Sequence, residues 1–411
     1  MANGQPLDDL QFDHHSSEHA ADPIMAYRLL REGPGFARSS LHGGFTVLCR
    51  YDDVVAVARD HEHFSNALEA PGGFKGGVTL PHNPAAHRMS FSEMDPPEWN
   101  SMRRLLNPTL SAEAVARFVP QIQEVTNAFI DRFVESGECD LVLDLCSPVP
   151  AVVTLQYLGL PTDEWERYAV PIHSSVYTPR EPGHPAFEHL NQQFTWIFDR
   201  LRAEIADRHS SPREDDLITS LIGAGLHDDL VFETVYTMLA AGVDTSTSVL
   251  SAALLHLSQY TEQKQALIDK PELLDPATEE FLRFYAPAQA TARTAMAETE
   301  VGGVRFRPGD RILLAWGSAN RDAGHFNEPD TFLIDRAPNR HVTFAHGIHR
   351  CIGAPLARQE LRVILEEVLR RIPDYEVDPA RAPTYPDLGL MFGYQTMPAT
   401  FSPGQVEGIS T

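Results

Sequence analysis

The sequence predicts a mainly helical protein with small β-sheets, an α+β fold formed by one large domain. Most of its apolar residues recur every three or four positions between charged residues, which is the spacing of one face of a helix. Strand-like runs are confined to a few places, and no Gly/Ser-rich linker, internal repeat or low-complexity block interrupts the 411 residues. We therefore expect residues 1–411 to form a single domain with an ample core.

The predicted elements are a few strands, two helices with apolar stripes and one unusually long helix. Strands are predicted at residues 44–49 and in the stretch 304–316, where Pro308-Gly309 suits a turn. The longest candidate helix runs from about residue 229 to 258, about 45 Å at 1.5 Å per residue, which is enough to cross the domain. Two further helices are predicted from apolar stripes, which comprise Ile122, Val125, Phe129 and Phe133, and Leu361, Leu365, Val368 and Ile372.

Charge and composition exclude some settings for the protein. The chain has 57 acidic and 33 basic residues, a net charge of −24, which argues against nucleic acid or an anionic membrane as a partner. The first thirty residues contain several acids and no apolar core. No later stretch is expected to reach the ~20 apolar residues of a membrane span. These features predict a soluble, cytoplasmic protein.

The most informative segment is the loop at residues 344–353, Phe-Ala-His-Gly-Ile-His-Arg-Cys-Ile-Gly. A thiolate that ligates haem iron lies beneath a flat macrocycle, so the backbone must turn tightly and leave no bulk against the ring, which suits Gly347 and Gly353. Pro355 comes early in the following candidate helix. Cys351 would then lie at a helix N-terminus, where free amides and the dipole favour the thiolate. A buried structural cysteine is the alternative interpretation.

Charged residues elsewhere favour the haem interpretation. Glu280 and Arg283 lie three residues apart on one face of a predicted helix, and Arg336 follows before the cysteine loop. In order and spacing, these segments resemble the cytochrome P450 family along nearly the whole chain. The resemblance implies that these three residues form a buried ionic triad.

The cysteine loop carries the same resemblance. It matches the family pattern Phe-x-x-Gly-x-x-x-Cys-x-Gly through Phe344, Gly347, Cys351 and Gly353, with Ala345 where the family usually has glycine. The resemblance implies a long central helix across a haem b group whose iron is ligated by Cys351. Because no Cys-x-x-Cys-His motif is present, the haem is expected to be held non-covalently.

Two more segments agree with the family. Asp244 and Thr245 match its oxygen-activating acid and alcohol, although back-bonding to helix carbonyls is the ordinary use of such a hydroxyl. Gly242 weakens the helix by about 1 kcal/mol relative to alanine and is expected to let its hydrogen-bond ladder open. Arg103 fits the family's propionate-binding arginine, and Trp99 stands where bacterial members often have histidine. Candidates for the two propionates are Arg103, Arg293 and His349.

The resemblance also implies the activity. We expect a monooxygenase that inserts one atom of dioxygen into an apolar or aromatic small molecule, with electrons that originate from NAD(P)H. Asp244 and Thr245 would deliver protons in a largely dry pocket. The predicted substrate pocket is mostly small or apolar, with Gln289 and Thr291 able to orient one polar group; its members are Ala240, Ala241, Gln289, Thr291, Met391 and Phe392.

The redox partner is expected to be a ferredoxin or a flavodoxin-type protein. It would dock on a basic proximal face, which we predict from five arginines in the two segments near the haem: Arg103, Arg104, Arg350, Arg358 and Arg362.

Three alternatives remain open from the sequence. A zinc site is conceivable because His341, His346, His349 and Cys351 fall within eleven residues. A haem-binding sensor or carrier would keep the cysteine loop but would not need the pair Asp244-Thr245. A peroxide-driven haem-thiolate enzyme would also dispense with that pair in its usual form.

Overall fold

The computed structural model describes residues 12–81, 87–178 and 183–408. Its helices are α1 Ser17–Ala21, α2 Pro23–Glu32, α3 Tyr51–Arg59, α4 Glu98–Leu106, α5 Ala112–Ile130, α6 Pro148–Leu158, α7 Trp165–Ser174, α8 Pro185–Ser210, α9 Leu217–Gly223, α10 Asp228–Gln259, α11 Thr261–Asp269, α12 Leu274–Tyr285, α13 Trp316–Ala319 and α14 Ala354–Arg371. The predicted fold class, mainly helical with small sheets, is confirmed.

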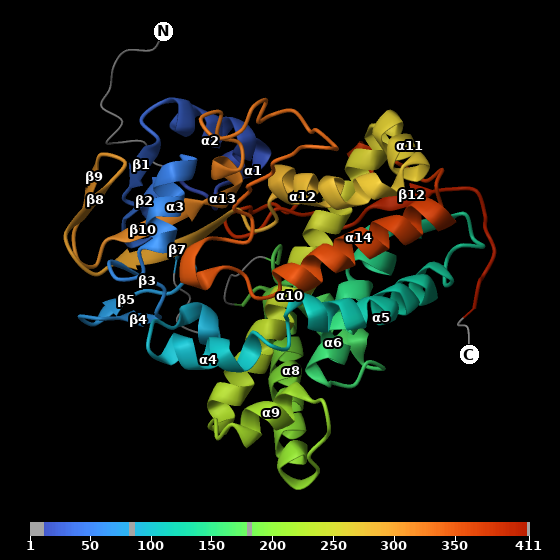
Figure 1. The fold of residues 1–411 in the computed structure, drawn as a ribbon, viewed down its shortest axis with the longest axis horizontal. Coiled ribbons are helices and arrows are strands. Elements are labelled where there is room, and N and C mark those ends of the chain that lie inside the picture. The colour runs from blue at the N-terminus through green and yellow to red at the C-terminus, as the bar shows by residue number, and fades with distance from the viewer. Residues whose placement is uncertain (1–11, 82–86, 179–182, 409–411) are drawn as a thin grey trace.

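The strands form one larger sheet and several short ones. They are β1 Phe36–Ser39, β2 Phe45–Leu48, β3 Phe64–Ser65, β4 Glu69–Ala70, β5 Phe74–Lys75, β6 Glu138–Asp140, β7 Ala290–Ala295, β8 Thr299–Val301, β9 Val304–Phe306, β10 Arg311–Ala315, β11 Glu376–Val377 and β12 Pro398–Thr400. The larger sheet has the order β1-β2-β10-β7-β3, and its β2–β10 pair is parallel. This sheet lies at one side of the molecule, and the helical part lies at the other (Figure 1).

The predicted strands are confirmed with small changes at their ends. Residues 44–49 become β2. The stretch 304–316 becomes β9 and β10, joined by a turn in which Gly309 has φ +93°. Trp316 does not extend the strand, because it begins the short helix α13.

The two predicted apolar stripes form part of the main core. Ile122, Val125 and Phe129 are buried on α5, and Leu361, Leu365 and Val368 are buried on α14. They belong to one apolar cluster that includes residues of α10 and α12. Helices α5 and α14 therefore pack directly against each other, beside the central helix (Figure 1).

The long helix predicted at residues 229–258 is α10, and it crosses the whole helical part of the fold. It contacts α6, α7, α8, α12 and α14. The expectation that no stretch reaches the length and hydropathy of a membrane span is wrong for this helix, whose best window has mean hydropathy 1.4. That window is 72% buried inside the protein, so the apolar residues serve the core.

The middle of α10 is a continuous helix in this structure. The hydrogen-bond ladder was expected to open near Gly242, but residues 228–259 are helical throughout. A Cβ atom added at Gly242 would lie 2.7 Å from Thr154 Oγ1 of α6. The glycine therefore permits the close approach of α6 to α10.

Candidate functional site

A cavity of about 310 Å³ lies between the middle of α10 and the loop that carries Cys351. The wall opposite the cysteine includes Ala241, Gly242 and Thr245 of α10. Strand β7 of the larger sheet contributes Thr291 and Arg293, and α4 contributes Trp99 and Arg103. The loop itself contributes Phe344, Ala345, His349, Arg350, Cys351 and Gly353. Segments from across the chain thus converge on one largely apolar space.

The backbone of the cysteine loop is a tight turn closed on itself. The Cys351 amide donates to the Phe344 carbonyl at 2.8 Å, which ties the two ends of the loop together. Gly347 has φ +73°, and a Cβ atom there would lie 2.2 Å from the Ala58 carbonyl oxygen of α3. Ala345 has φ +56°, a left-handed conformation that explains why glycine suits this position.

The two loop glycines have different roles from those expected. Gly347 does not line the cavity; it allows the loop to pack against α3. Gly353 lines the cavity but has no positive φ, and an added Cβ atom would meet only Cys351 Sγ at an ordinary 3.8 Å. A side chain at position 347 would therefore clash with α3, whereas one at position 353 would meet no protein atom closer than an ordinary contact distance.

The Cys351 side chain reaches the cavity just before α14 begins. Burial raises the pKa of the Cys351 thiol, and four groups act in the opposite direction: the amides of Gly353 and Ala354 and the charges of Arg103 and Arg358. Metal binding deprotonates a coordinating thiol outright. The amides at the N-terminus of α14 therefore stabilise the form of sulfur that binds a metal.

The cavity wall also carries cationic and imidazole groups that lack acidic partners among the described residues. Arg103 Nε and His349 Nε2 are buried without a hydrogen-bond partner there, and both side chains contact Trp99. Arg293 is 3% exposed and, among the described residues, donates to Thr291 Oγ1 and the Ala292 carbonyl. Burial lowers the pKa of His349 to about 2, with Arg293 and Arg103 adding to the shift.

This set of groups fits a haem. The thiol and α10 line the same cavity, and unpartnered groups at the wall are suited to the two anionic propionates of the macrocycle. Trp99 fills the place of a family histidine by packing its ring against His349 and the Arg103 guanidinium, with centroid distances of 5.7 and 5.6 Å. An anionic group there would satisfy donors that are otherwise buried at a cost in free energy.

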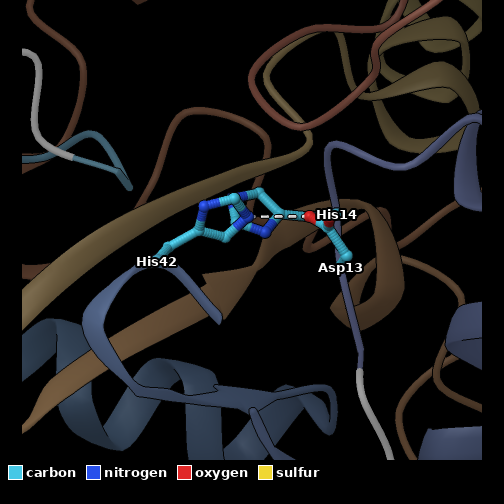
Figure 2. Close-up of side chains that lie close together, drawn as sticks. All are labelled: Asp13, His14 and His42. Atoms are coloured by element: carbon cyan, nitrogen blue, oxygen red, sulfur yellow. Dashed lines mark hydrogen bonds and ion pairs between the residues drawn. The ribbon is translucent and has the colours of Figure 1, made fainter. Parts of the chain in front are cut away.

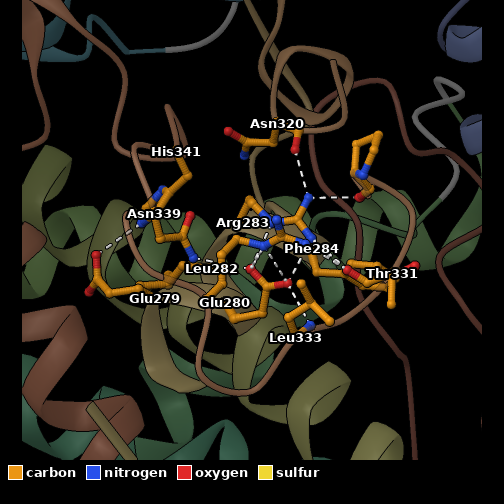
Figure 3. Close-up of polar contacts among 12 residues, drawn as sticks. Glu279, Glu280, Leu282, Arg283, Phe284, Asn320, Thr331, Leu333, Asn339 and His341 are labelled. Atoms are coloured by element: carbon orange, nitrogen blue, oxygen red, sulfur yellow. Dashed lines mark hydrogen bonds and ion pairs between the residues drawn. The ribbon is translucent and has the colours of Figure 1, made fainter. Parts of the chain in front are cut away.

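The charged residues Glu280, Arg283 and Arg336 meet in the core behind the cysteine loop. Glu280 accepts two hydrogen bonds from Arg283, each 2.7 Å, and Arg336 Nε lies 3.0 Å from the same carboxylate. Arg283 also donates to the carbonyls of Asn320, Pro329 and Thr331. Figure 3 shows Arg283 beside Glu280, with Asn320 and Thr331 around it. The network fastens α12 to the segment that leads into residues 344–353.

The predicted acid and alcohol of α10 point in different directions. Thr245 lines the cavity, and its hydroxyl donates back to the Ala241 carbonyl at 2.7 Å. Asp244 is 2% exposed and does not line the cavity. Its carboxylate accepts a 2.7 Å hydrogen bond from His173 Nδ1 of α7 and one of 3.1 Å from the Tyr385 hydroxyl.

His173 is a site residue that the sequence analysis missed. Its other ring nitrogen donates to the Gln395 carbonyl at 3.1 Å, so both nitrogens face acceptors and the imidazolium form fits best. Burial alone would lower the pKa of His173, but the hydrogen bond and charge of Asp244 outweigh burial and raise it. No local signal in the sequence pairs these residues, which are 71 positions apart.

A second unpredicted acid, Glu360 of α14, lies at the cavity wall. Ser246 of α10 donates to its Oε2 at 2.7 Å, while Oε1 is buried without a partner among the described residues. Burial raises the pKa of Glu360 to about 8, so the carboxyl is mainly neutral at pH 7. A neutral carboxyl held between α10 and α14 can donate a proton or a hydrogen bond.

The structure brings only part of the predicted substrate pocket to the cavity. Ala241 and Thr291 line it, whereas four predicted members do not: Ala240, Gln289, Met391 and Phe392. Gln289 donates instead to the carbonyls of Tyr285 and Ala286. Additional apolar lining comes from Val78, Phe91, Leu110, Met238 and Val249.

The zinc alternative does not match the geometry. His341 pairs with Glu279, and His346 contacts Arg59, while His349 and Cys351 line the cavity. In the part of the chain that the structure describes, the three-residue group with metal-binding spacing is elsewhere, at Asp13, His14 and His42.

The predicted basic face is only partly free. Arg358 pairs with Glu279 at 2.5 Å, Arg362 pairs with Asp275 at 3.0 Å, and Arg103 lines the cavity. Arg104 and Arg350 are exposed and have no ion pair with a described residue. Two of the five arginines thus remain as unpaired surface charges.

Comparisons with known proteins agree with this geometry. Residues 181–399 match the Cytochrome P450 family model. The chain is 33% identical to a steroid C26-monooxygenase of Mycolicibacterium smegmatis over 92% of both proteins. Two similar solved structures, each 26% identical, are CYP268A2 of Mycobacterium marinum with pseudoionone and CYP109E1 of Bacillus megaterium with testosterone. Their TM-scores are 0.87 and 0.81, and they cover 97% and 94% of this chain and all of their own. The chain therefore belongs to the cytochrome P450 family of haem-thiolate monooxygenases.

Proposed function

We propose that this monooxygenase oxidises an apolar or aromatic small molecule bound between α10 and the cysteine loop. The observation that carries the proposal is the cavity itself, in which a thiol at the start of α14 faces the small residues Ala241 and Gly242 of α10. The lining of the cavity as a whole is mostly apolar, so the substrate would be held mainly by burial of apolar surface. Relatives crystallised with testosterone and pseudoionone support this substrate class.

The cofactor is haem b, and electrons originate from NAD(P)H through partner proteins. When bound, the haem supplies the redox chemistry that activates dioxygen. The Cys351 thiolate would hold the haem iron and would donate charge to it. Arg103, Arg293 and His349 would hold the propionates, because all three line the cavity, and Arg103 Nε and His349 Nε2 are buried there without a partner among the described residues.

Asp244 and Thr245 would manage protons on the α10 side of the cavity. The Thr245 hydroxyl lies at the cavity surface and can accept a hydrogen bond while donating to Ala241. Asp244 must exchange protons with Thr245 through water or by rotating away from His173, because its carboxylate faces α7 in this structure. Tyr385 and His173 would hold the carboxylate toward α7 until it rotates.

A soluble electron donor of the ferredoxin or flavodoxin type would dock near Arg104 and Arg350. Both arginines are exposed without an acidic partner among the described residues, and Arg350 adjoins Cys351 on the chain and at the cavity wall. An acidic partner would be attracted to this surface even though the whole chain is negative. The protein would then work in the cytoplasm.

Reconstitution of the haem-loaded chain tests the proposal. Apolar candidates are screened for a change in haem absorption on binding, and hits are incubated with ferredoxin, its reductase and NADPH. The proposal predicts one oxygen atom from labelled dioxygen in the product and no product from the variant Cys351→Ser. Equal turnover with hydrogen peroxide and no electron donor would instead establish the peroxide-driven alternative.

A further inference from the structure

We propose that Asp13, His14 and His42 form a binding site for a divalent transition-metal ion, with Zn²⁺ as its occupant. The site lies near the start of the described chain and shares no residue with the cavity of Cys351. Asp13 and His14 precede α1, and His42 lies in the turn Leu41–Gly43 between β1 and β2. Figure 2 shows the three side chains gathered at this point.

The geometry suits a single ion. One carboxylate oxygen and one nitrogen from each imidazole lie within 4.8 Å of one another. In this structure, His42 Nε2 donates to Asp13 Oδ1 at 2.8 Å. A cation would replace the proton of that hydrogen bond and draw the same two side chains together.

The unpartnered ring nitrogen of His14 also supports a metal site, independently of the distances among the three side chains. Its Nε2 lies 2.9 Å from the Leu80 carbonyl oxygen, which can only accept, so Nε2 carries the proton and Nδ1 carries the lone pair. His14 is 1% exposed, and Nδ1 has no partner among the described residues. A buried acceptor without a donor is costly. A metal-bound histidine typically has this arrangement, in which the second ring nitrogen donates to a backbone carbonyl.

The ligand set selects the class of metal. Two imidazoles and one carboxylate suit Zn²⁺, with the fourth position left to water, whereas Mg²⁺ and Ca²⁺ prefer oxygen ligands. The neighbouring His15 is not a ligand, because its Nδ1 donates to Asp387 at 2.8 Å and its Nε2 to the Leu80 carbonyl at 2.7 Å. Both its nitrogens are therefore protonated, and Asp387 balances the charge.

The bound ion would fasten the N-terminal segment to the larger sheet. Asp13 and His14 would be tied to the turn between β1 and β2, and the Leu80 carbonyl would orient His14 from a third segment. The proposed role is structural, so removal of the ion is expected to lower the melting temperature and to leave the haem absorption spectrum unchanged.

The test uses full-length, haem-loaded protein without a polyhistidine tag. After dialysis against a chelator, Zn²⁺ is titrated by calorimetry, and metal content is measured separately by mass spectrometry. We expect one Zn²⁺ per chain in addition to haem iron, and no binding of Mg²⁺ at the same concentration. His14→Gln and His42→Gln should each weaken Zn²⁺ binding by at least roughly 100-fold, the upper range for loss of a supporting residue.

Two control variants keep the result specific. His15→Gln removes a neighbouring histidine whose nitrogens are already engaged, and His227→Gln removes an exposed one. Both should retain the stoichiometry of one. The proposal is overturned if the wild-type protein binds no Zn²⁺ at this stoichiometry, or if it binds Mg²⁺ equally well. It is also overturned if His14→Gln and His42→Gln, with normal haem spectra, bind Zn²⁺ like the wild type.

Discussion

At the scale of single residues, the neighbours Asp244 and Thr245 show how one helix serves two environments. Successive residues of an α-helix point about 100° apart, so one can face the cavity while the other faces α7. Thr245 contacts the cavity, and Asp244 is held by His173 and Tyr385. Asp244 and Thr245 are neighbours in the sequence, but their side chains point to different environments. They can exchange a proton only through water or after one side chain rotates.

Replacing Thr245 with alanine tests the proposed proton role. The variant should bind haem as the wild type does, but less product should form per NADPH, and more hydrogen peroxide should be released, because the hydroxyl no longer directs protons. Product and peroxide are measured in the same reaction. Thr247→Ala is the control, since its hydroxyl donates to the Cys146 and Val243 carbonyls and does not line the cavity. Unchanged coupling in Thr245→Ala would contradict the assignment.

His173 should make stability depend on pH with a definite sign. Because folding raises its pKa, the stabilising pair with Asp244 is complete below about pH 6.5, the unfolded pKa, and weakens as pH rises through the folded pKa. The stability lost in His173→Gln, measured by urea unfolding, should therefore shrink as the pH rises above 6.5. His256→Gln is a control of opposite sign, since burial lowers the pKa of His256 and its contribution falls below pH 6.5. Parallel pH curves for the two variants would refute this account.

At the scale of elements, the triad links α12 to the segment that precedes the cysteine loop. Glu280 and Arg283 are fully buried, so their charges are stable only as a set with Arg336. Glu280→Gln should cost about 3–5 kcal/mol, because it leaves two buried guanidinium groups without their carboxylate. Urea unfolding and haem content measure the effect.

The adjacent residue provides the matched control for that prediction. Glu279 of the same helix is partly exposed and pairs with the similarly exposed Arg358 and with the buried side chain of His341. Glu279→Gln should cost less than Glu280→Gln, since solvent partly screens the ion pair between Glu279 and Arg358. If both variants lose the same free energy of unfolding, the buried triad contributes no more to stability than the pair of Glu279.

These elements also show which features were accessible from the sequence. The residues of the cysteine loop and the triad have fixed local spacing, and the apolar stripes of α5 and α14 have helical periodicity, so each was recognisable without a structure. The direction of Asp244 was not, because it depends on Tyr385, 141 residues away. The sequence predicts that Gly242 weakens α10. In the structure, a side chain at this position would clash with Thr154 of α6, and a sequence alone does not show that contact. In both cases the prediction and the structure differ because the residue contacts a segment that is distant in the sequence.

At the scale of the whole molecule, a strongly acidic chain carries Arg104 and Arg350 as exposed residues without an ion pair to a described residue. The double variant Arg104→Glu, Arg350→Glu should slow reduction by ferredoxin and flatten its salt dependence, because attraction to an acidic partner is lost. Stopped-flow reduction at several ionic strengths measures this. Arg305→Glu reverses an exposed charge on β9 and should have no such effect. Identical salt dependence in the double variant and the wild type would place the docking surface elsewhere.

The central claim is that Cys351 ligates the haem iron. Its most direct test is the carbon monoxide difference spectrum of the reduced, haem-loaded chain, compared with that of Cys351→His. We predict the strongly red-shifted Soret band of a thiolate ligand for the wild type and its loss in the variant, with haem still bound. Folded wild-type protein that takes up no haem, or that gives the same spectrum as the variant, would contradict the claim.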